Sequence, residues 1–328
     1  MLTGAIEEMS INFALIGAAG YIAPRHMKAI KDTGNRLLAA TDPHDAVGVL
    51  DRFFLDTKYF SEIERFDRHV DKLRRAGEGN RIHYISICSP NYLHDAHIRL
   101  ALRNGAHAIC EKPLVINPWN LDAIQEIVRE TGKNVNTVLQ LRVHPTLKDL
   151  KEKLGREQPK RRRDVVLTYI TGRGAWYPMS WKGSEERSGG LAANIGIHFF
   201  DLLMWLFGRE IRSEVHLREQ KQMAGMLELE HADVRWFLSV DMADLPFPAQ
   251  PGDKTTYRSI RMDGNELEFT EGFNDLHTRL YEQTLEGSGF GIEDARHSIE
   301  LAYRIRTAKI SDSPGLLHPI LQKRGHGR

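Results

Sequence analysis

The sequence predicts an α/β protein of two domains. The first is a doubly wound parallel sheet, and the second is an α+β domain with an open, mostly antiparallel sheet. In the first half, short apolar runs alternate with stretches of helical spacing, which is typical of a parallel sheet covered on both faces. From about Thr146, runs follow one another across short turns such as residues 263–265, which favours antiparallel pairing. With 328 residues, the chain is long enough for both domains.

Five strands are expected in the first half, because five apolar runs stop at residues that break a strand or carry a polar side chain. Helical spacing follows at residues 97–102 and 121–127. We expect a dinucleotide-binding domain at residues 11–145. The strands are Ile11–Ile16, Leu37–Thr41, Ile82–Cys88, His107–Cys110 and Val135–Gln140.

The second domain is expected at residues 146–310, with a role in substrate binding and oligomerisation. Its helical stretch is residues 292–310, and residues 311–328 are expected to be a surface extension. The expected strands are Asp164–Thr171, Val234–Val240, Tyr257–Met262 and Glu266–Thr270.

The balance of basic and acidic residues excludes a strong electrostatic field around the whole protein. Net charge is +1, from 45 basic and 44 acidic residues, so neither nucleic acid nor a membrane is an expected partner. The basic run 159–163 lacks interleaved aromatic residues and is expected to be a solvated edge. No apolar run is expected to span a bilayer, and the N-terminus lacks a signal pattern, so a cytoplasmic location is expected.

The two cysteines, Cys88 and Cys110, each fall in an apolar run that predicts a strand. They are therefore expected to be buried and reduced. Neither belongs to a CxxC pair or lies near a cluster of metal-ligating residues. No metal site is expected.

A glycine-containing turn, residues 17–23 (GAAGYIA), follows the first strand. Glycine permits a tight turn and close approach of a pyrophosphate, so this pattern is typical of a Rossmann dinucleotide-binding domain. The spacing departs from the strict fingerprint, and a structural turn without a ligand is the alternative. Candidate cofactor residues here are Gly17, Ala19, Gly20, Tyr21 and Ile22.

Asp42 ends the second strand, 25 residues after Gly17. A carboxylate there can accept hydrogen bonds from both ribose hydroxyls and would repel a 2′-phosphate, which favours NAD over NADP. His44 is a possible secondary contact. The alternative is that Asp42 is a plain turn residue.

Further candidates lie at the ends of the other strands, where ligands bind in parallel sheets. Glu111 is placed to orient either the neighbouring lysine or a cofactor ribose, and His94 is either a helix-start residue or a cofactor contact. The candidates for the cofactor are Ser89, Pro90, Asn91, His94, Glu111, Lys112 and Gln140.

Lys112, in the sequence Glu-Lys-Pro, follows the fourth strand, where an ammonium is costly to bury. A cation at this edge can stabilise a hydroxyl oxygen as hydride leaves. His198 is the best candidate for the general base, because its ordinary pKa lies near neutrality. Asp201, one helical turn on, is a candidate to orient it. For Lys112 the alternative is an exposed Lys-Pro turn without a catalytic role. For His198 the alternative is a structural histidine that packs at the start of a helix.

The segment from residue 173 to 190 is rich in glycine, aromatic residues and cations. Aromatic rings can stack on a base or sugar, and basic groups suit a diphosphate or a carboxylate. An interface loop is the alternative of equal weight. The candidate substrate residues are Arg173, Trp176, Tyr177, Trp181 and Lys182, together with Lys112, Asn194 and His198.

Taken together, these motifs resemble the glucose–fructose oxidoreductase / inositol dehydrogenase / MocA family. The resemblance rests on GxxGxxA after the first strand, SPNxxH, EKP and the segment GGLAANIGIHFFD. It covers residues 11–310 and implies an NAD-dependent oxidoreductase with Lys112 and His198 as catalytic residues. Asn194 departs from the Asp that is common in the family, which suggests a changed substrate group.

Several longer phrases, including CEKPLVINPWN and WYPMSWKG, are similar to the WlbA/WbpB-type sugar-nucleotide oxidases of this family. This resemblance implies oxidation at C3 of UDP-N-acetylglucosaminuronic acid for surface polysaccharide (O-antigen) synthesis, with 2-oxoglutarate as a possible oxidant of bound NADH. A homodimer or tetramer is expected. The alternatives are another sugar or inositol as substrate, or a non-catalytic dinucleotide-binding regulator.

Overall fold

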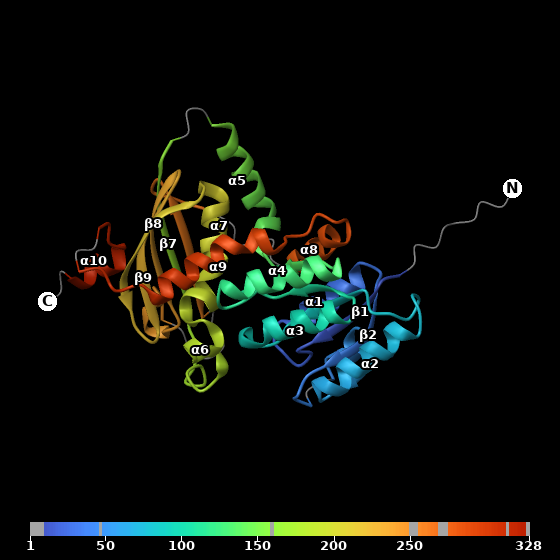
Figure 1. Cartoon of the computed structure of the whole chain (residues 1–328). Coiled ribbons are helices and arrows are strands. Elements are labelled where there is room, and N and C mark those ends of the chain that lie inside the picture. The colour runs from blue at the N-terminus through green and yellow to red at the C-terminus, as the bar shows by residue number, and fades with distance from the viewer. Residues whose placement is uncertain are drawn as a thin grey trace.

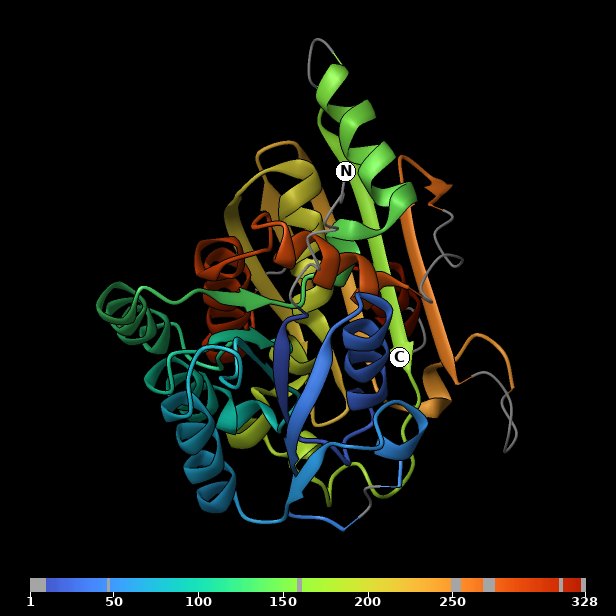
Figure 2. The ribbon, with the colours of Figure 1, turned by 90° about the vertical axis from the view of Figure 1, so that its right-hand side faces the viewer.

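The computed structural model describes residues 10–45, 48–157, 161–248, 255–267, 275–312 and 315–325. Two sheets form the two halves of the molecule, as predicted, and each has six strands (Figure 1). Figure 2 shows strands β1 and β2 of the first sheet in front of the second sheet. The fold class is therefore a Rossmann-like α/β half joined to a mixed, mostly antiparallel α+β half.

The first sheet, sheet A, is entirely parallel, with the strand order β3-β2-β1-β4-β5-β6. The chain moves outward from β1 in one direction and then continues from β4 in the other, so the two central strands mark a topological switch point. The strands are β1 (Asn12–Ile16), β2 (Arg36–Thr41), β3 (Lys58–Phe60), β4 (Tyr84–Ile87), β5 (His107–Cys110) and β6 (Val135–Thr137).

Helices cover both faces of sheet A because its strands are apolar on both sides. Phe13 and Leu15 pack in one cluster with α1 and α8, while Ala14 and Ile16 pack in another with α2, α3 and α4. Such two-sided burial is expected of a parallel sheet. The helices are α1 (Ala23–Asp32), α2 (Ile63–Arg75), α3 (His94–Arg103), α4 (Trp119–Thr131) and α8 (Leu276–Leu285).

The second sheet, sheet B, has the order β12-β11-β7-β10-β9-β8, and only the β7–β10 pair is parallel. One face packs on α5 (Pro145–Arg156), α7 (Ile197–Phe207) and α9 (Ile292–Thr307). Its strands are β7 (Arg163–Thr171), β8 (Glu210–Arg218), β9 (Gln222–Leu229), β10 (Ala232–Ser239), β11 (Thr256–Met262) and β12 (Asn265–Glu266).

Helix α9 joins the two halves. Its first turns place Ile292 and Ile299 in a core cluster of sheet A, and its later turns place Leu301 and Ile305 in the core of sheet B. Figure 1 shows it running across both halves beside α4. This shared packing fixes the position of one sheet against the other.

The structure corrects several expected elements. Strands β3, β8 and β9 were not expected, and the fifth run forms a strand only to Thr137 before the 3₁₀ turn η3 (Gln140–Val143). The expected strand at 266–270 is described only to residue 267, and residues 268–270 lie outside the described part. The domain limits stay a prediction.

The C-terminal segment is more than a surface extension, which corrects the expectation for residues 311–328. Helix α10 (Pro319–Gly325) lies against the other face of sheet B, where Ile320 and Leu321 pack against Ile170 and Phe237. Residues 313–314 and 326–328 lie outside the described part.

The basic run behaves as an edge of β7 where it is described. Arg162 pairs with Asp233 (2.6 Å), and Arg163 with Asp263 (2.6 Å). Residues 158–160 lie outside the described part. These two arginines are therefore paired with acids of the same sheet and of its β11–β12 turn.

One segment corrects the expectation about bilayer-length runs. Within the described residues, the helical stretch Glu185–Phe207 is long and apolar enough, by length and composition, to cross a membrane. However, 72% of its apolar window is buried inside the protein. It includes α7 and contributes Phe200 and Leu203 to the core of sheet B.

Candidate active site

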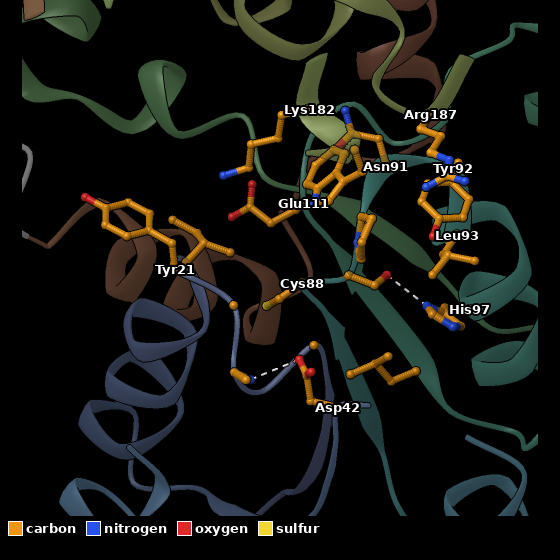
Figure 3. Close-up of a pocket in the computed structure, with 18 of the residues that line it drawn as sticks. Tyr21, Asp42, Cys88, Asn91, Tyr92, Leu93, His97, Glu111, Lys182 and Arg187 are labelled. Atoms are coloured by element: carbon orange, nitrogen blue, oxygen red, sulfur yellow. Dashed lines mark hydrogen bonds between the residues drawn. The ribbon is translucent and has the colours of Figure 1, made fainter. Parts of the chain in front are cut away.

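A cleft of about 990 Å³ lies at the carboxyl edge of sheet A, and both halves of the chain line it. Sheet A contributes the loops after β1, β2, β3, β4 and β5. The second half contributes the end of β7, the segment 173–187 and the first residues of α7. Figure 3 shows Asp42 and Cys88 on the sheet side of this cleft, with Lys182 and Arg187 facing them. The switch point between β1 and β4 is where such sheets bind ligands.

The turn after β1 has the shape that a dinucleotide requires. Gly17 has φ 90°, and a β-carbon there would lie 2.6 Å from the carbonyl carbon of Cys88. The turn is therefore restricted to glycine and leaves its backbone open to the cleft. The predicted residues that line the cleft here are Gly17, Ala19, Gly20, Tyr21 and Ile22.

Asp42 lies at the end of β2, 7% exposed, and its carboxylate faces this turn. Its Oδ2 accepts a hydrogen bond from the backbone N–H of Ala19 (3.0 Å), and its Oδ1 accepts one from the N–H of His44 (2.9 Å). Both Asp42 and His44 line the cleft. Glu62 and Glu64 line the same end, so this end is acidic and suits ribose hydroxyls better than an extra phosphate.

The loop after β4 forms one wall. Ser89, Pro90 and Asn91 line the cleft as predicted, and the buried amide of Asn91 donates to the carbonyl of Ser188 (2.8 Å). The Ser89 hydroxyl lies 2.8 Å from Nδ1 of His97 (Figure 3). Burial lowers the pKa of His97 to about 4, so this ring is neutral.

Two predicted cofactor residues lie elsewhere. His94 is fully buried behind the wall, with its ring nitrogens 2.7 Å and 2.8 Å from the carbonyl oxygens of Pro113 and Ser89. It joins the two loops and does not line the cleft, because the start of α3 turns it inward. Gln140 belongs to η3 and is likewise absent from the lining.

Lys112 lies in the wall of the cleft, just after β5, where the Lys112–Pro113 peptide bond is cis. Its ammonium donates a hydrogen bond to the main-chain carbonyl of Asn194 (2.9 Å), which belongs to the second half. Burial lowers the pKa of Lys112 to about 8. The Glu111 carboxylate opposes this shift, whereas the nearby cations Lys182 and Arg173 add to it.

Glu111 lines the cleft and also belongs to a buried cluster behind it. Its Oε1 lies 2.9 Å from Nε2 of His26 and 3.2 Å from Nε2 of His277. Burial would raise the pKa of Glu111, but hydrogen bonds from the two rings outweigh it and hold that pKa well below its usual range. The ligand atoms of the three lie within 4.8 Å of one another, but all are engaged in these hydrogen bonds.

His198 lines the cleft at the start of α7 and is partly buried. Burial, followed by the charge of Lys112, places the pKa of His198 well below its ordinary value. The ring is therefore neutral near pH 7 and able to accept a proton. A π-helical turn, η5 (Ala192–Gly196), precedes it and carries Asn194 into the same lining.

The prediction that Asp201 orients His198 is wrong. Both carboxylate oxygens of Asp201 accept hydrogen bonds from the guanidinium of Arg142, at 2.6 Å and 2.9 Å. That guanidinium also pairs with Asp294 of α9 (3.2 Å). Asp201 is thus committed to bracing α7 against η3 and α9.

The glycine-rich segment supplies basic and aromatic groups to the cleft. Trp176 differs from the prediction: it is 49% exposed and lies outside the lining, although the Lys182 ammonium lies 5.9 Å from its ring centre. Tyr177 is buried, and its hydroxyl lies 3.5 Å from the amide of Asn194. The predicted substrate residues in the lining are Lys112, Arg173, Tyr177, Trp181, Lys182, Asn194 and His198.

Sequence reasoning missed several lining residues. Tyr169 and Thr171 had a usable signal, because they alternate at the end of a predicted strand and therefore share a face. Glu62 and Glu64 had none, since they follow β3, a strand of three residues that was not expected. The other missed residues include Tyr92, Leu93, His97, Arg187 and Ile195.

A glycine turn and a carboxylate on a Rossmann-like sheet, facing a lysine and a neutral histidine, are typical of a dinucleotide-dependent oxidoreductase. Sequence comparison agrees with this class. Residues 11–138 match the GFO/IDH/MocA oxidoreductase family, NAD-binding Rossmann fold, and residues 164–243 match its C-terminal alpha/beta domain. The chain belongs to this family of oxidoreductases and uses NAD.

Among solved structures, the WlbA (WbpB) dehydrogenase of Thermus thermophilus is similar over nearly the whole chain. The two are 53% identical with a TM-score of 0.89, over 94% of this chain and 99% of that one. That enzyme has been crystallised with NAD and alpha-ketoglutarate, and with NAD and UDP-GlcNAcA.

More distant relatives share the family or the fold. Inositol 2-dehydrogenase of Rhizobium meliloti (strain 1021) is 27% identical over 203 residues, or 62% of this chain. The match spans only 56% of that curated relative. The WlbA dehydrogenase of Bordetella pertussis, at 20% identity over 92% of this chain and 96% of that one, has a TM-score of 0.72 and shows a shared fold.

Proposed function

We propose that this protein oxidises the C3 hydroxyl of UDP-N-acetylglucosaminuronic acid (UDP-GlcNAcA) and that 2-oxoglutarate reoxidises the bound NADH. One observation carries the proposal. Lys112 and the neutral His198 line the same cleft as the cations Arg173 and Lys182, in a chain 53% identical to an enzyme crystallised with both compounds.

The residues fit NAD on the structure itself. The Gly17 turn has no room for a β-carbon, and Asp42 and His44 line the cleft beyond it. The acidic end formed with Glu62 and Glu64 disfavours a 2′-phosphate. NAD, when bound, supplies the hydride acceptor.

Oxidation of a secondary alcohol removes a proton from oxygen and a hydride from carbon, and the chain's own groups manage the proton. His198 accepts it, because its ring is neutral. The Lys112 ammonium, held by the carbonyl of Asn194, donates to the same oxygen and stabilises its growing negative charge. When 2-oxoglutarate is reduced, His198 returns a proton to the new hydroxyl.

Cations favour an anionic substrate over a neutral polyol. Arg173, Lys182 and Arg187 line the substrate side, and guanidinium and ammonium groups suit carboxylate and phosphate oxygens. Asn194 adds no negative charge where a uronate would approach. A 2-oxoacid dicarboxylate is matched by the same cations.

The proposal is tested by incubating the purified protein with UDP-GlcNAcA, with and without 2-oxoglutarate, and identifying products by mass spectrometry. We expect many turnovers to a 3-keto sugar nucleotide only with the oxoacid. UDP-N-acetylglucosamine, which lacks the carboxylate, and inositol serve as matched controls. Preferential oxidation of inositol would instead support the activity of the inositol 2-dehydrogenase relative. NAD binding without any oxidation would favour a regulator.

The cellular setting remains part of the proposal. Synthesis of diacetamido-uronic acids of surface polysaccharide is the pathway that this reaction fits. A cytoplasmic, dimeric or tetrameric enzyme is expected, and sedimentation of the purified protein tests the assembly.

A further inference from the structure

A buried chain of polar side chains lies behind Lys112, and the mechanism above does not use it. It runs from Glu111 to His26 on α1, then to Tyr281 on α8 and Ser86 on β4. His277, also on α8, joins it at Glu111. Apart from Glu111, none of these side chains lines the cleft, so Glu111 is the member of this polar network that faces it.

One arrangement of the protons satisfies this whole network. His26 has one ring nitrogen 2.9 Å from the carboxylate and the other 2.7 Å from the Tyr281 hydroxyl, which lies 2.6 Å from Ser86. If Ser86 donates to Tyr281 and Tyr281 donates to His26, the single proton of His26 remains on Nε2 and is donated to Glu111. A neutral ring and an ionised carboxylate then satisfy every polar hydrogen in the chain.

The charge of Glu111 matters because it opposes the groups that lower the pKa of Lys112. Burial lowers that pKa, the Glu111 carboxylate raises it, and the cations Lys182 and Arg173 lower it further. Loss of the Glu111 charge would therefore deprotonate Lys112 at a lower pH.

We propose that His26, His277 and Tyr281 are positioning residues that keep Glu111 an anion beside Lys112, so that Lys112 stays an ammonium donor. The inference rests on the proposed function for the role of Lys112 in catalysis. Its structural part, the link between the buried rings and the charge of the lysine, needs no substrate.

Other charged or titratable groups also lie close enough to influence the cluster. The thiols Cys88 and Cys110 stay protonated, because burial raises their pKa values well above the usual range. The groups that act on Glu111, Lys112 or His26 from the packed elements are Arg25, Cys88, His94, Cys110, Arg173, Lys182, His198, His277 and Tyr281.

The test measures the titration of Lys112 directly in the full-length protein. Trace acetylation with acetic anhydride across a pH series, read by peptide mass spectrometry, gives the midpoint at which Lys112 becomes reactive. We expect His277→Leu to lower this midpoint by about one pH unit, and His277→Gln, which retains an N–H donor, to restore much of it.

Tyr281→Phe keeps the buried ring and removes only the hydroxyl, so it tests the chain without a large cavity. It frees Nδ1 of His26, which then either takes the proton from Nε2 or gains a second one. Moving the proton removes a hydrogen bond that stabilises the Glu111 anion, and adding one places a positive charge beside it. Either change weakens the effect of that anion on Lys112, so a smaller downward shift is expected. His318→Leu is the control, since His318 is also buried but is hydrogen-bonded to Thr168, and neither residue lines the cleft.

An unchanged midpoint in both His277→Leu and Tyr281→Phe would overturn the inference, as would an equal shift in His318→Leu. Stoichiometric zinc in the purified protein that is lost in His277→Leu would also overturn it, because the cluster would then be a metal site. A protein that shows the expected midpoint shifts but does not oxidise UDP-GlcNAcA would refute the proposed function and leave this structural link intact.

Discussion

At the scale of single residues, Lys112 shows how position changes chemistry. It follows a buried strand and is held by the carbonyl of Asn194, so part of its hydration is lost. Burial therefore lowers its pKa to about 8, and Glu111 limits the fall. A lysine so placed donates a strong hydrogen bond and releases its proton near physiological pH.

Lys112→Met tests this role. We expect turnover to fall by about 10²-fold or more, since a charge-stabilising donor is lost from the reacting oxygen. The affinity for NAD, measured by calorimetry, should change little. Lys148→Met, at an exposed position on α5, is the control. Normal turnover of Lys112→Met would remove the lysine from the mechanism.

The pH dependence follows from the same pKa. Because the pKa of Lys112 is lowered to about 8, the ammonium is lost as the pH rises through that value, and kcat/KM should fall above it. His198 is neutral down to a pH well below its ordinary pKa, so activity should persist below pH 6.5. Activity that still rises above pH 9 would contradict this assignment.

Gly17 is tested by Gly17→Ala. A methyl group would combine a left-handed φ of 90° with a 2.6 Å approach to the Cys88 carbonyl, so the turn must shift. We expect weaker NAD binding and a loss of roughly 1–3 kcal/mol in the free energy of unfolding. Gly34→Ala has a similar φ, 73°, with no atom near the added carbon, and serves as control. Equal effects of the two would mean that the close approach is unimportant.

At the scale of elements, ion pairs around Arg142 hold α7 in place. The guanidinium joins Asp201 of α7 to Asp294 of α9, and it is mostly buried. His198, the proposed base, lies in the first turn of the same helix as Asp201. These ion pairs therefore also fix the position of His198 in the cleft.

Asp201→Asn should destabilise the protein by about 3 kcal/mol in denaturant unfolding, because it leaves a buried cation with fewer partners. Asp95→Asn removes a pair with Arg99 on α3 that is only partly buried and should cost about 1 kcal/mol or less. If the two variants unfold at the same denaturant concentration, Arg142 does not brace the fold.

The elements that the sequence predicts are those with strong local patterns. Strands β1, β2 and β4 are apolar runs closed by Gly17, Asp42 and Ser89. Strand β8 (EIRSEVHLR) was missed because an edge strand with alternating charges resembles a loop, and β3 was missed because it is short. Asp201 was misassigned because helical spacing does not show the long-range partner Arg142.

At the scale of the whole molecule, the cleft exists because α9 holds two sheets together. Residues 92 and 187 lie far apart in sequence, yet both line the cleft and the guanidinium of Arg187 lies 5.7 Å from the ring centre of Tyr92. Strand ends of sheet A could be predicted to converge, because parallel strands share one carboxyl edge. The residues that the second half contributes to the cleft could not be predicted, because their position depends on how the two domains pack.

The central claim is that hydride leaves C3 of UDP-GlcNAcA and is later delivered to 2-oxoglutarate within one cleft. The most direct measurement uses UDP-GlcNAcA labelled with deuterium at C3 and follows the label by mass spectrometry. The account predicts deuterium at C2 of the 2-hydroxyglutarate formed, in equal amount to the 3-keto product. A 2-hydroxyglutarate without the label, or a keto product that retains it, would contradict the account.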